Sequence, residues 1–296
     1  MNLADLEERT RQYGKELFAR IDRQGPVILT KPWVEDKLMG LGMNDPALKV
    51  QLFRFVDTLP YLKESRDVSG HLRESLAEAG DELPWWVRRG MKLLPKDGLL
   101  SAGLAFAART GARQMARKFI AGSNVKEALA AIQVLRSRRL AFTIDLLGEA
   151  TITEAEADHV QQQYFDLLHG LEADVNRWPE DPRIDRDDRG PIPRVNVSVK
   201  LSALSSQFDP IDPEGTSHAV CRRLRPILRL AKRTGAFVNF DMEQYSFKDT
   251  TLRIFKEILT EPEFREWPNV GIAIQAYLRD TEADLASLLD WAKNER

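Results

Sequence analysis

The sequence predicts an α/β fold of the (β/α)8 barrel type, of which only the first four βα units are present, preceded by an all-helical region. Two observations predict this fold. After about residue 138, strand patterns and helix patterns alternate four times, which is typical of right-handed βα units on a parallel sheet. Each predicted strand has one apolar and one polar row of side chains, whereas a sheet covered by helices on both faces is apolar on both rows. The polar rows fit the interior of a TIM-type barrel, whose helices lie outside only.

Residues 1–137 are predicted to be helical throughout. Apolar residues recur there at helical spacing, as at Leu48, Leu52, Phe55 and Leu59. Glycine and proline residues divide the region into short and medium-length helices. No residue in it indicates chemistry, so we interpret residues 1–137 as an arm, an oligomerisation surface or a cover for the barrel that residues 138–296 begin.

The elements of the barrel follow in order. A helix capped by Ser123 or Asn124 precedes the first strand. Thr153 and Glu156 form a capping box that opens the helix after that strand, and Thr281 is expected to cap the last helix. The predicted strands are residues 140–149, 195–201, 236–241 and 270–277, and the helices after them are residues 153–176, 217–234, 249–259 and 281 onward.

The polar row of each strand ends in an ionisable or amide side chain at the carboxyl end of the strand. Barrel enzymes carry their active sites at that end. A cation, two carboxylates and an amide suit a small zwitterionic ligand, because the lysine pairs with a ligand carboxylate and an acidic side chain lies beside a ligand ammonium or places a proton. The alternative for each residue is an internal ion pair that only neutralises the barrel interior. The four residues are Glu149, Lys200, Asp241 and Gln275.

Composition excludes several classes of function. The net charge is −2, with 43 basic and 45 acidic side chains, so no overall field favours nucleic acid or anionic lipid. The single cysteine, Cys221, excludes an internal disulfide. The most apolar segment, residues 99–108, is soon followed by Arg109 and is shorter than the ~20 residues that cross a bilayer. None of the four histidines lies at a strand tip or in a ligand pair, so no metal is expected. We expect a cytoplasmic protein.

Four segments at the strand tips resemble a known family. FTIDLLGEA, VNVSVKLSAL, VNFDMEQY and VGIAIQAY follow in this order, each at the end of a predicted strand. They resemble the proline dehydrogenase domain, most closely that of the bifunctional proline utilisation A enzymes, which also carry an L-glutamate γ-semialdehyde dehydrogenase domain. The resemblance implies an FAD-dependent barrel that oxidises L-proline to 1-pyrroline-5-carboxylate and passes electrons to a quinone. Self-association and peripheral membrane contact through the quinone are further expectations from it.

The resemblance also implies roles for individual residues. Asp241 matches the catalytic aspartate of the family, and Lys200 matches the lysine that binds the substrate. Glu149 matches an acidic residue that pairs with a substrate-binding arginine. Met242 and Gln275 match positions that contact FAD.

The family's later strands, its last helix and their arginines have no counterpart in this chain. We therefore expect an N-terminal part of the barrel that by itself binds FAD poorly and turns over little proline. Two other interpretations stay open from the residues. One is a Schiff-base aldolase that uses Lys200 as its nucleophile. The other is a non-catalytic helical interaction module with a half-barrel.

Overall fold

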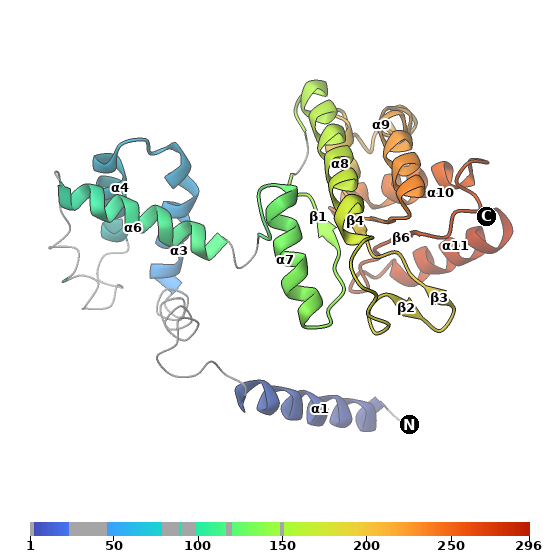
Figure 1. Ribbon diagram of the computed structural model, residues 1–296, viewed down its shortest axis with the longest axis horizontal. Helices are drawn as coiled ribbons and strands as arrows, with labels where there is room; N and C mark the ends of the chain where they lie inside the picture. Colours follow the sequence, from blue (N-terminus) through green and yellow to red (C-terminus); the bar gives the residue numbers. More distant parts are fainter. Residues whose placement is uncertain (1–2, 24–45, 79–88, 90–98, 117–119, 149–150) are drawn as a thin grey trace. The chain divides into compact units, whose positions relative to one another are not determined.

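The computed structural model describes residues 3–23, 46–78, 89, 99–116, 120–148 and 151–296. The chain forms two compact units, Met1–Phe119 and Ile120–Arg296 (Figure 1). The sequence analysis placed the boundary after residue 137. The structure groups helix α7, Val125–Ser137, with the second unit, because α7 packs against helix α8, Glu154–Val175.

The described part of the first unit is helical, as predicted. Helix α3 packs against α4, and α4 packs against α6. Their shared core is built from Phe55, Leu59, Val68 and Ala105. The helices are α1 (Leu3–Arg23), α3 (Pro46–Thr58), α4 (Ser65–Glu78) and α6 (Leu99–Ala116), with a short 3-10 turn η1 (Leu59–Tyr61) after α3.

The second unit is built on a parallel sheet of four strands in the order β1-β4-β5-β6. A helix follows each strand, so strand and helix alternate four times as the sequence predicts (Figure 1). The strands are β1 (Ile144–Asp145), β4 (Asn196–Val199), β5 (Phe237–Phe240) and β6 (Val270–Ile272). The helices that follow them are α8, α9 (Pro213–Thr234), α10 (Lys248–Thr260) and α11 (Thr281–Asn294).

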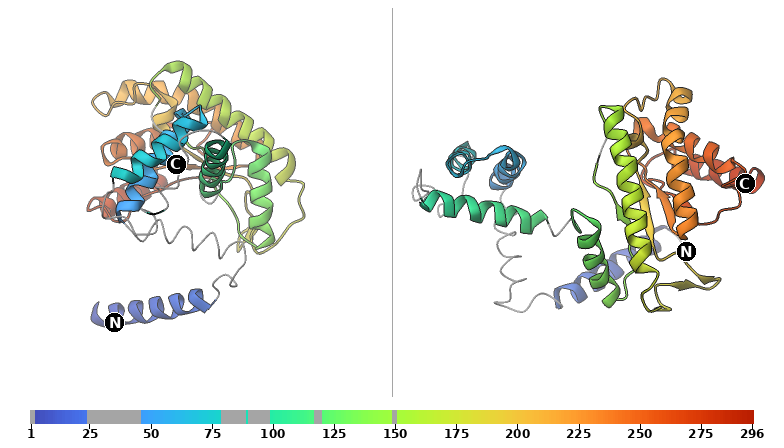
Figure 2. Two further views of the ribbon diagram at one scale, coloured as in Figure 1. Left: turned by 90° about the vertical axis from the view of Figure 1, so that its left-hand side faces the viewer. Right: turned by 45° about the horizontal axis from the view of Figure 1, so that its top comes forward.

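The two faces of this sheet differ in burial. The register pairs Ile144 with Val197, Val197 with Val238, and Val238 with Val270, so one face is an apolar layer. Val197 and Val238 are fully or almost fully buried in a core shared with α8, α9, α10 and α11. Figure 2 shows α8 and α9, which pack on each other, as long neighbouring helices. The polar row therefore lies on the opposite face, as predicted.

Two local signals of the sequence are confirmed. At the start of α8, the Thr153 hydroxyl accepts the N–H of Glu156 at 3.2 Å, and the Glu156 carboxylate accepts the N–H of Thr153 at 3.1 Å. Backbone N–H groups of Ile152 and Thr153 lower the pKa of Glu156. At the end of α9, Gly235 has φ = 70°, a left-handed conformation that glycine adopts without a steric cost.

Two local predictions about helix starts are corrected. Thr281 does not cap α11: Asp280 precedes the helix, and the Thr281 hydroxyl donates to the Gln275 carbonyl at 2.6 Å. Helix α9 begins at Pro213, four residues before the predicted start at residue 217. The reason is that Asp212 accepts the N–H of Gly215 and Pro213 fits the first turn.

The strands are also shorter than predicted, and two elements are additional. The loop of residues 178–194 contains a two-stranded hairpin, β2 (Arg186–Asp187) with β3 (Gly190–Pro191). A 3-10 turn, η3 (Leu201–Leu204), follows β4 directly. The chain therefore turns immediately after Lys200.

The capping box predicts a measurable stability. We expect Thr153→Ala to lower the free energy of unfolding by about 1 kcal/mol, because the N–H of Glu156 loses its side-chain acceptor. Urea denaturation followed by circular dichroism measures the change. Thr153→Ser keeps the hydroxyl and is the control. Equal stability of the alanine variant and the wild type would contradict the role of the capping box.

Candidate active site

Lys200 lies at the carboxyl end of β4, on the same face as Ser198. Its side chain is only 14% exposed. A lysine with so little contact with water needs anionic or polar partners, because the desolvated ammonium is otherwise unfavourable. Those partners come from the two strands on either side of β4.

Two carboxylates flank the Lys200 ammonium. Asp145 of β1 forms an ion pair and a hydrogen bond with Nζ. The Oδ2 atom of Asp241, directly after β5, lies 3.7 Å from Nζ, and the carbonyl oxygen of Leu146 accepts a hydrogen bond at 3.4 Å. The structure thus brings together two residues that the sequence analysis selected, Lys200 and Asp241, and adds Asp145.

Asp241 is held by the backbone around it. Its N–H donates to the carbonyl of Val199 at 2.9 Å, which extends the pairing of β4 with β5 by one residue. Its Oδ1 atom accepts the N–H of Met242 at 3.0 Å. Because Oδ1 is engaged in this way, Oδ2 faces Lys200.

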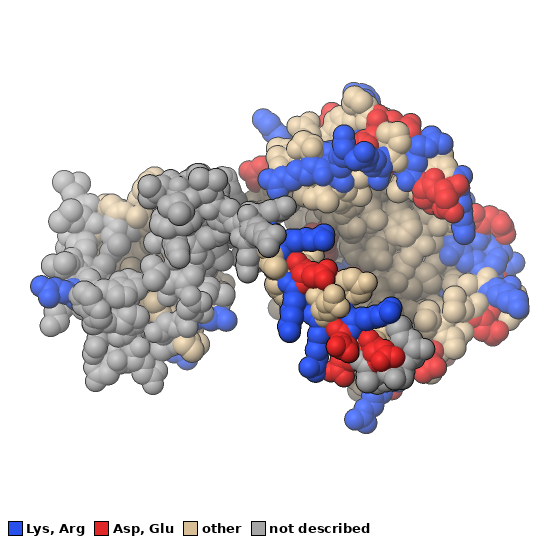
Figure 3. All heavy atoms as spheres, turned by 90° about the horizontal axis from the view of Figure 1, so that it is seen from below, with Lys and Arg blue, Asp and Glu red and all other residues tan. Residues whose placement is uncertain are grey.

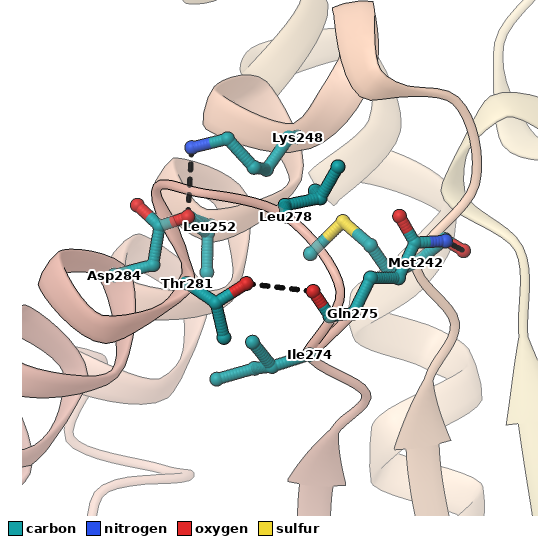
Figure 4. Close-up of a pocket in the computed structure, with 8 residues that line it drawn as sticks. All are labelled: Met242, Lys248, Leu252, Ile274, Gln275, Leu278, Thr281 and Asp284. Carbon is teal, nitrogen blue, oxygen red and sulfur yellow. Dashed lines mark hydrogen bonds and ion pairs between the residues drawn. The ribbon is translucent and has the colours of Figure 1, made fainter.

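Met242 and Gln275 lie next to each other at the ends of β5 and β6. The Gln275 amide nitrogen donates to the carbonyl oxygens of Met242 and Glu243 at 3.2 and 3.3 Å. These bonds orient the amide, and its oxygen is the atom that can accept a bond from a ligand. The Met242 side chain is buried and points toward the pocket shown in Figure 4.

The pocket beside Met242 and Gln275 is small. Its volume is about 10 Å³, which is room for one water-sized molecule and excludes a substrate the size of an amino acid. The residues that line it are Met242, Lys248, Leu252, Ile274, Gln275, Leu278, Thr281 and Asp284 (Figure 4). In contrast, Figure 3 shows a broad hollow in the second unit with a mostly uncharged floor.

Another lysine, Lys248, is buried and borders the pocket. Its ammonium lies 2.7 Å from Asp249 and 2.8 Å from Asp284. Burial alone would lower the pKa of Lys248, but the bonds to the two carboxylates raise it above its usual range. The two carboxylates balance the charge of the Lys248 ammonium, and the ion pair with Asp284 connects α10 to α11.

Tyr164 of α8 supports the end of β4 from within the core. Its hydroxyl donates to the carbonyl of Ser198 at 3.3 Å and accepts the N–H of Lys200 at 3.2 Å. Burial of the phenol raises its pKa, and the nearby carboxylates of Asp145, Glu243 and Asp241 act in the same direction. Tyr164 is therefore a neutral phenol that satisfies the backbone on both sides of Ser198 and Lys200.

Glu243 makes a similar connection between strand ends. Its carboxylate accepts the N–H of Ser202 at 3.1 Å and also the Ser202 hydroxyl. This contact joins the segment after β5 to the turn η3 after β4. The sequence analysis selected neither Glu243 nor Tyr164, because neither stands on the polar row of a strand.

The remaining expectations concern Glu149, metals and membranes. Glu149 lies outside the described residues. Within the described ranges, no group of three histidine, cysteine, aspartate or glutamate residues is arranged to hold a metal ion. Among the helices described, none is both long and apolar enough to cross a membrane.

Comparison with family models assigns both units. The model of the proline utilization A N-terminal domain matches residues 7–119. The model of proline dehydrogenase matches residues 128–296.

Individual relatives agree with these models. Bifunctional protein PutA of Escherichia coli is 27% identical over 184 residues, which are 62% of this chain and 13% of the relative. Proline dehydrogenase 1 of Bacillus subtilis is 28% identical over 191 residues, 64% of this chain and 54% of the relative. The chain thus spans about half, or far less, of the length of these relatives.

Solved structures of proline utilization A are similar in fold. The structure from Bdellovibrio bacteriovorus, inactivated by N-propargylglycine, has a TM-score of 0.81 and 36% identity and covers 98% of this chain and 28% of its own. A structure from Bradyrhizobium japonicum has a TM-score of 0.56 and 20% identity over 88% of this chain and 28% of its own. The second similarity concerns the fold alone.

The hydrogen bonds of Tyr164 predict a specific loss of stability. Tyr164→Phe should lower the free energy of unfolding by about 1–3 kcal/mol, because it leaves a buried N–H and a buried carbonyl without their partner. Urea denaturation measures this. Tyr277→Phe is the matched control, because the Tyr277 side chain is exposed and its loss of a hydroxyl should have no effect. If both variants are as stable as the wild type, Tyr164 is only a packing residue.

Proposed function

The chain belongs to the proline dehydrogenase family, whose model matches more than half of its residues, and on this premise we propose that it contributes to an enzyme that oxidises L-proline to 1-pyrroline-5-carboxylate. The names of its relatives, proline dehydrogenase and bifunctional protein PutA, support this substrate and reaction. The reaction removes two electrons and two protons from the substrate.

The observation that carries the proposal is the position of Lys200 between Asp145 and Asp241. L-Proline is a zwitterion whose carboxylate and ring nitrogen are neighbours. Lys200 would bind the carboxylate by a charge-assisted hydrogen bond. The Oδ2 atom of Asp241 would accept a hydrogen bond from the ring nitrogen and so hold the substrate at the strand tips as the catalytic aspartate.

The residues at the strand tips fit the ring system of a flavin. Such a ring needs apolar contact on its face and hydrogen-bonding groups at its edge. Met242 offers an apolar, polarizable side chain, and Gln275 offers an amide whose orientation is fixed by two backbone carbonyls. FAD, when bound, would supply the acceptor for the hydride. The hydride leaves the ring CH2 carbon next to nitrogen, not the carbon that carries the carboxylate. A quinone is the proposed final electron acceptor.

The oxidation itself needs the substrate nitrogen to lose its proton before or as the hydride leaves. Asp241 is within reach of that nitrogen in the proposed orientation, and Lys200 holds the carboxylate so that the ring cannot turn. The protein therefore contributes orientation and charge.

Other parts of the proposal concern the whole protein. We infer that the four βα units are the first four of a (β/α)8 barrel and that the helical unit before it, Met1–Phe119, acts as an arm, an oligomerisation surface or a cover. Glu149 is proposed to pair with a substrate-binding arginine. A cytoplasmic location with peripheral membrane contact through the quinone, and self-association, belong to the same proposal.

The test uses the protein expressed from its complete gene and loaded with FAD. Reduction of a quinone should depend on L-proline, and 1-pyrroline-5-carboxylate should accumulate. A protein that binds FAD but leaves the quinone oxidised in the presence of proline would refute the proposal. Trapping of Lys200 by borohydride with a ketone or aldehyde would instead indicate a Schiff-base enzyme.

Substitution of Lys200 should lower the affinity for the substrate directly, because Lys200 is proposed to bind the substrate carboxylate. Lys200→Met should weaken proline binding by about 1.5–3 kcal/mol, roughly 10- to 150-fold, because it removes a charge-assisted hydrogen bond. The change is measured as the rise in KM or Kd for L-proline.

Lys256→Met is the matched control, because Lys256 is also half-buried and hydrogen-bonded, to Ser287, but lies on α10 away from the strand tips. The control should keep the wild-type KM. Unchanged kinetics in Lys200→Met would remove Lys200 from the substrate site.

A further inference from the structure

We propose that Asp145 is a positioning residue for Lys200: it holds the ammonium away from Asp241 and so keeps one N–H of Lys200 directed at the substrate carboxylate. The inference rests on the proposed function for the identity of the ligand. The position of the Lys200 ammonium does not depend on the identity of the ligand and can be tested without any ligand.

The hydrogen bonds of the ammonium are the first step. A lysine ammonium has three N–H donors. Asp145 takes one, and the carbonyl oxygen of Leu146 takes another at 3.4 Å. Asp241 lies 3.7 Å away, within reach of an ion pair but beyond a hydrogen bond. Among the described residues, these are the acceptors around Nζ, so the third N–H remains for a ligand.

The origin of the two carboxylates is the second step. Asp145 belongs to β1 and Asp241 follows β5, and these strands lie on opposite sides of β4 in the sheet. The lysine therefore lies between two negative charges that pull it in opposite directions. The contact with Asp145 is the closer one, and it keeps the ammonium from completing a hydrogen bond with Asp241.

Loss of the charge of Asp145 would change this balance. Asp241 would be the remaining carboxylate beside Lys200, and a charge-assisted hydrogen bond at about 2.8 Å is shorter than the present 3.7 Å. Closing that gap needs a movement of only about 1 Å. The resulting Lys200–Asp241 pair would engage both groups that are proposed to contact the zwitterion.

An electrostatic effect acts in the opposite direction. Asp145 is a negative charge, so its removal by itself strengthens the attraction between Lys200 and an anion. Asp145 is 45% exposed, which screens this long-range contribution. The change in the position of the Lys200 ammonium is a short-range effect on a side chain that is only 14% exposed, so solvent screens it less. We therefore expect the loss of positioning to dominate.

The experiment compares Asp145→Asn with the wild type in the FAD-loaded protein expressed from its complete gene. The probe is tetrahydro-2-furoate, which has the ring and carboxylate of proline but an oxygen in place of the ring nitrogen. Asp145→Asn should weaken its binding by about tenfold in calorimetry. Asp145→Glu, which keeps the charge, should restore most of the affinity. Equal or tighter binding by Asp145→Asn would overturn the proposal.

The matched control is Glu180→Gln. The Glu180 side chain is 44% exposed and forms an ion pair with Arg186 at 3.3 Å, so it resembles Asp145 in exposure and pairing but lies in the loop before β2. Its substitution should leave probe binding unchanged. Equal weakening by both variants would show a general loss of charge or stability and would count against a positioning role.

Crystal structures without ligand give the second readout. In Asp145→Asn, the Nζ atom of Lys200 should move to hydrogen-bond distance from Oδ2 of Asp241. A lysine that keeps its position in this variant overturns the proposal, whatever the binding data show. If the wild type binds no probe while the lysine moves as expected, the proposed substrate is wrong and the positioning role of Asp145 stands.

Discussion

The alternation of side chains along four parallel strands is the constraint on which the rest of the second unit depends. The register aligns Ile144, Val197, Val238 and Val270 in one layer beneath the helices. Full burial of a side chain, as at Val197 and Val238, stabilises the fold by about 1.5–3 kcal/mol. A slip of one residue would turn a whole strand over and place Lys200 in the apolar core. The packing of the core therefore fixes which side chains meet at the site.

The ends of the strands impose a second requirement, because backbone groups beyond the last pair of a sheet need other partners. Tyr164 satisfies the groups around the end of β4, Glu243 satisfies the N–H of Ser202, and Gln275 satisfies two carbonyls after β5. Each of these side chains completes backbone bonding and also joins neighbouring segments of the site. The positions of these side chains thus follow from hydrogen bonding that the fold needs in any case.

The sequence predicts those features that depend on local pattern. The capping box at Thr153, the left-handed Gly235 and the common face of Lys200 and Asp241 all follow from spacing along the chain. The contact of Lys200 with Asp145 does not follow from spacing. Alternation along a strand predicts the face on which a side chain lies, but it does not predict which neighbour on that face a long lysine side chain contacts. Tyr164 has the spacing of a core residue on a helix, so the sequence pattern predicts its burial but not the hydrogen bonds of its hydroxyl.

The same distinction explains the errors. Thr281 has the residue type of a helix cap, but its hydroxyl finds the carbonyl of Gln275, an acceptor that only the tertiary structure provides. The prediction that residues 125–137 belong with the helical region rested on their helical pattern. Their packing against α8 is a long-range contact that no such pattern contains.

The balance of charge at the site argues for the kind of ligand that it suits. Lys200, Asp145 and Asp241 carry one positive and two negative charges, so a ligand with only a carboxylate meets a cluster that is already negative. A ligand that brings an ammonium beside its carboxylate offsets the additional negative charge and also uses the third N–H of Lys200, which has no acceptor among the residues that the structure describes. Because opposite charges attract each other, this match favours a small zwitterionic amino acid over a simple carboxylic acid.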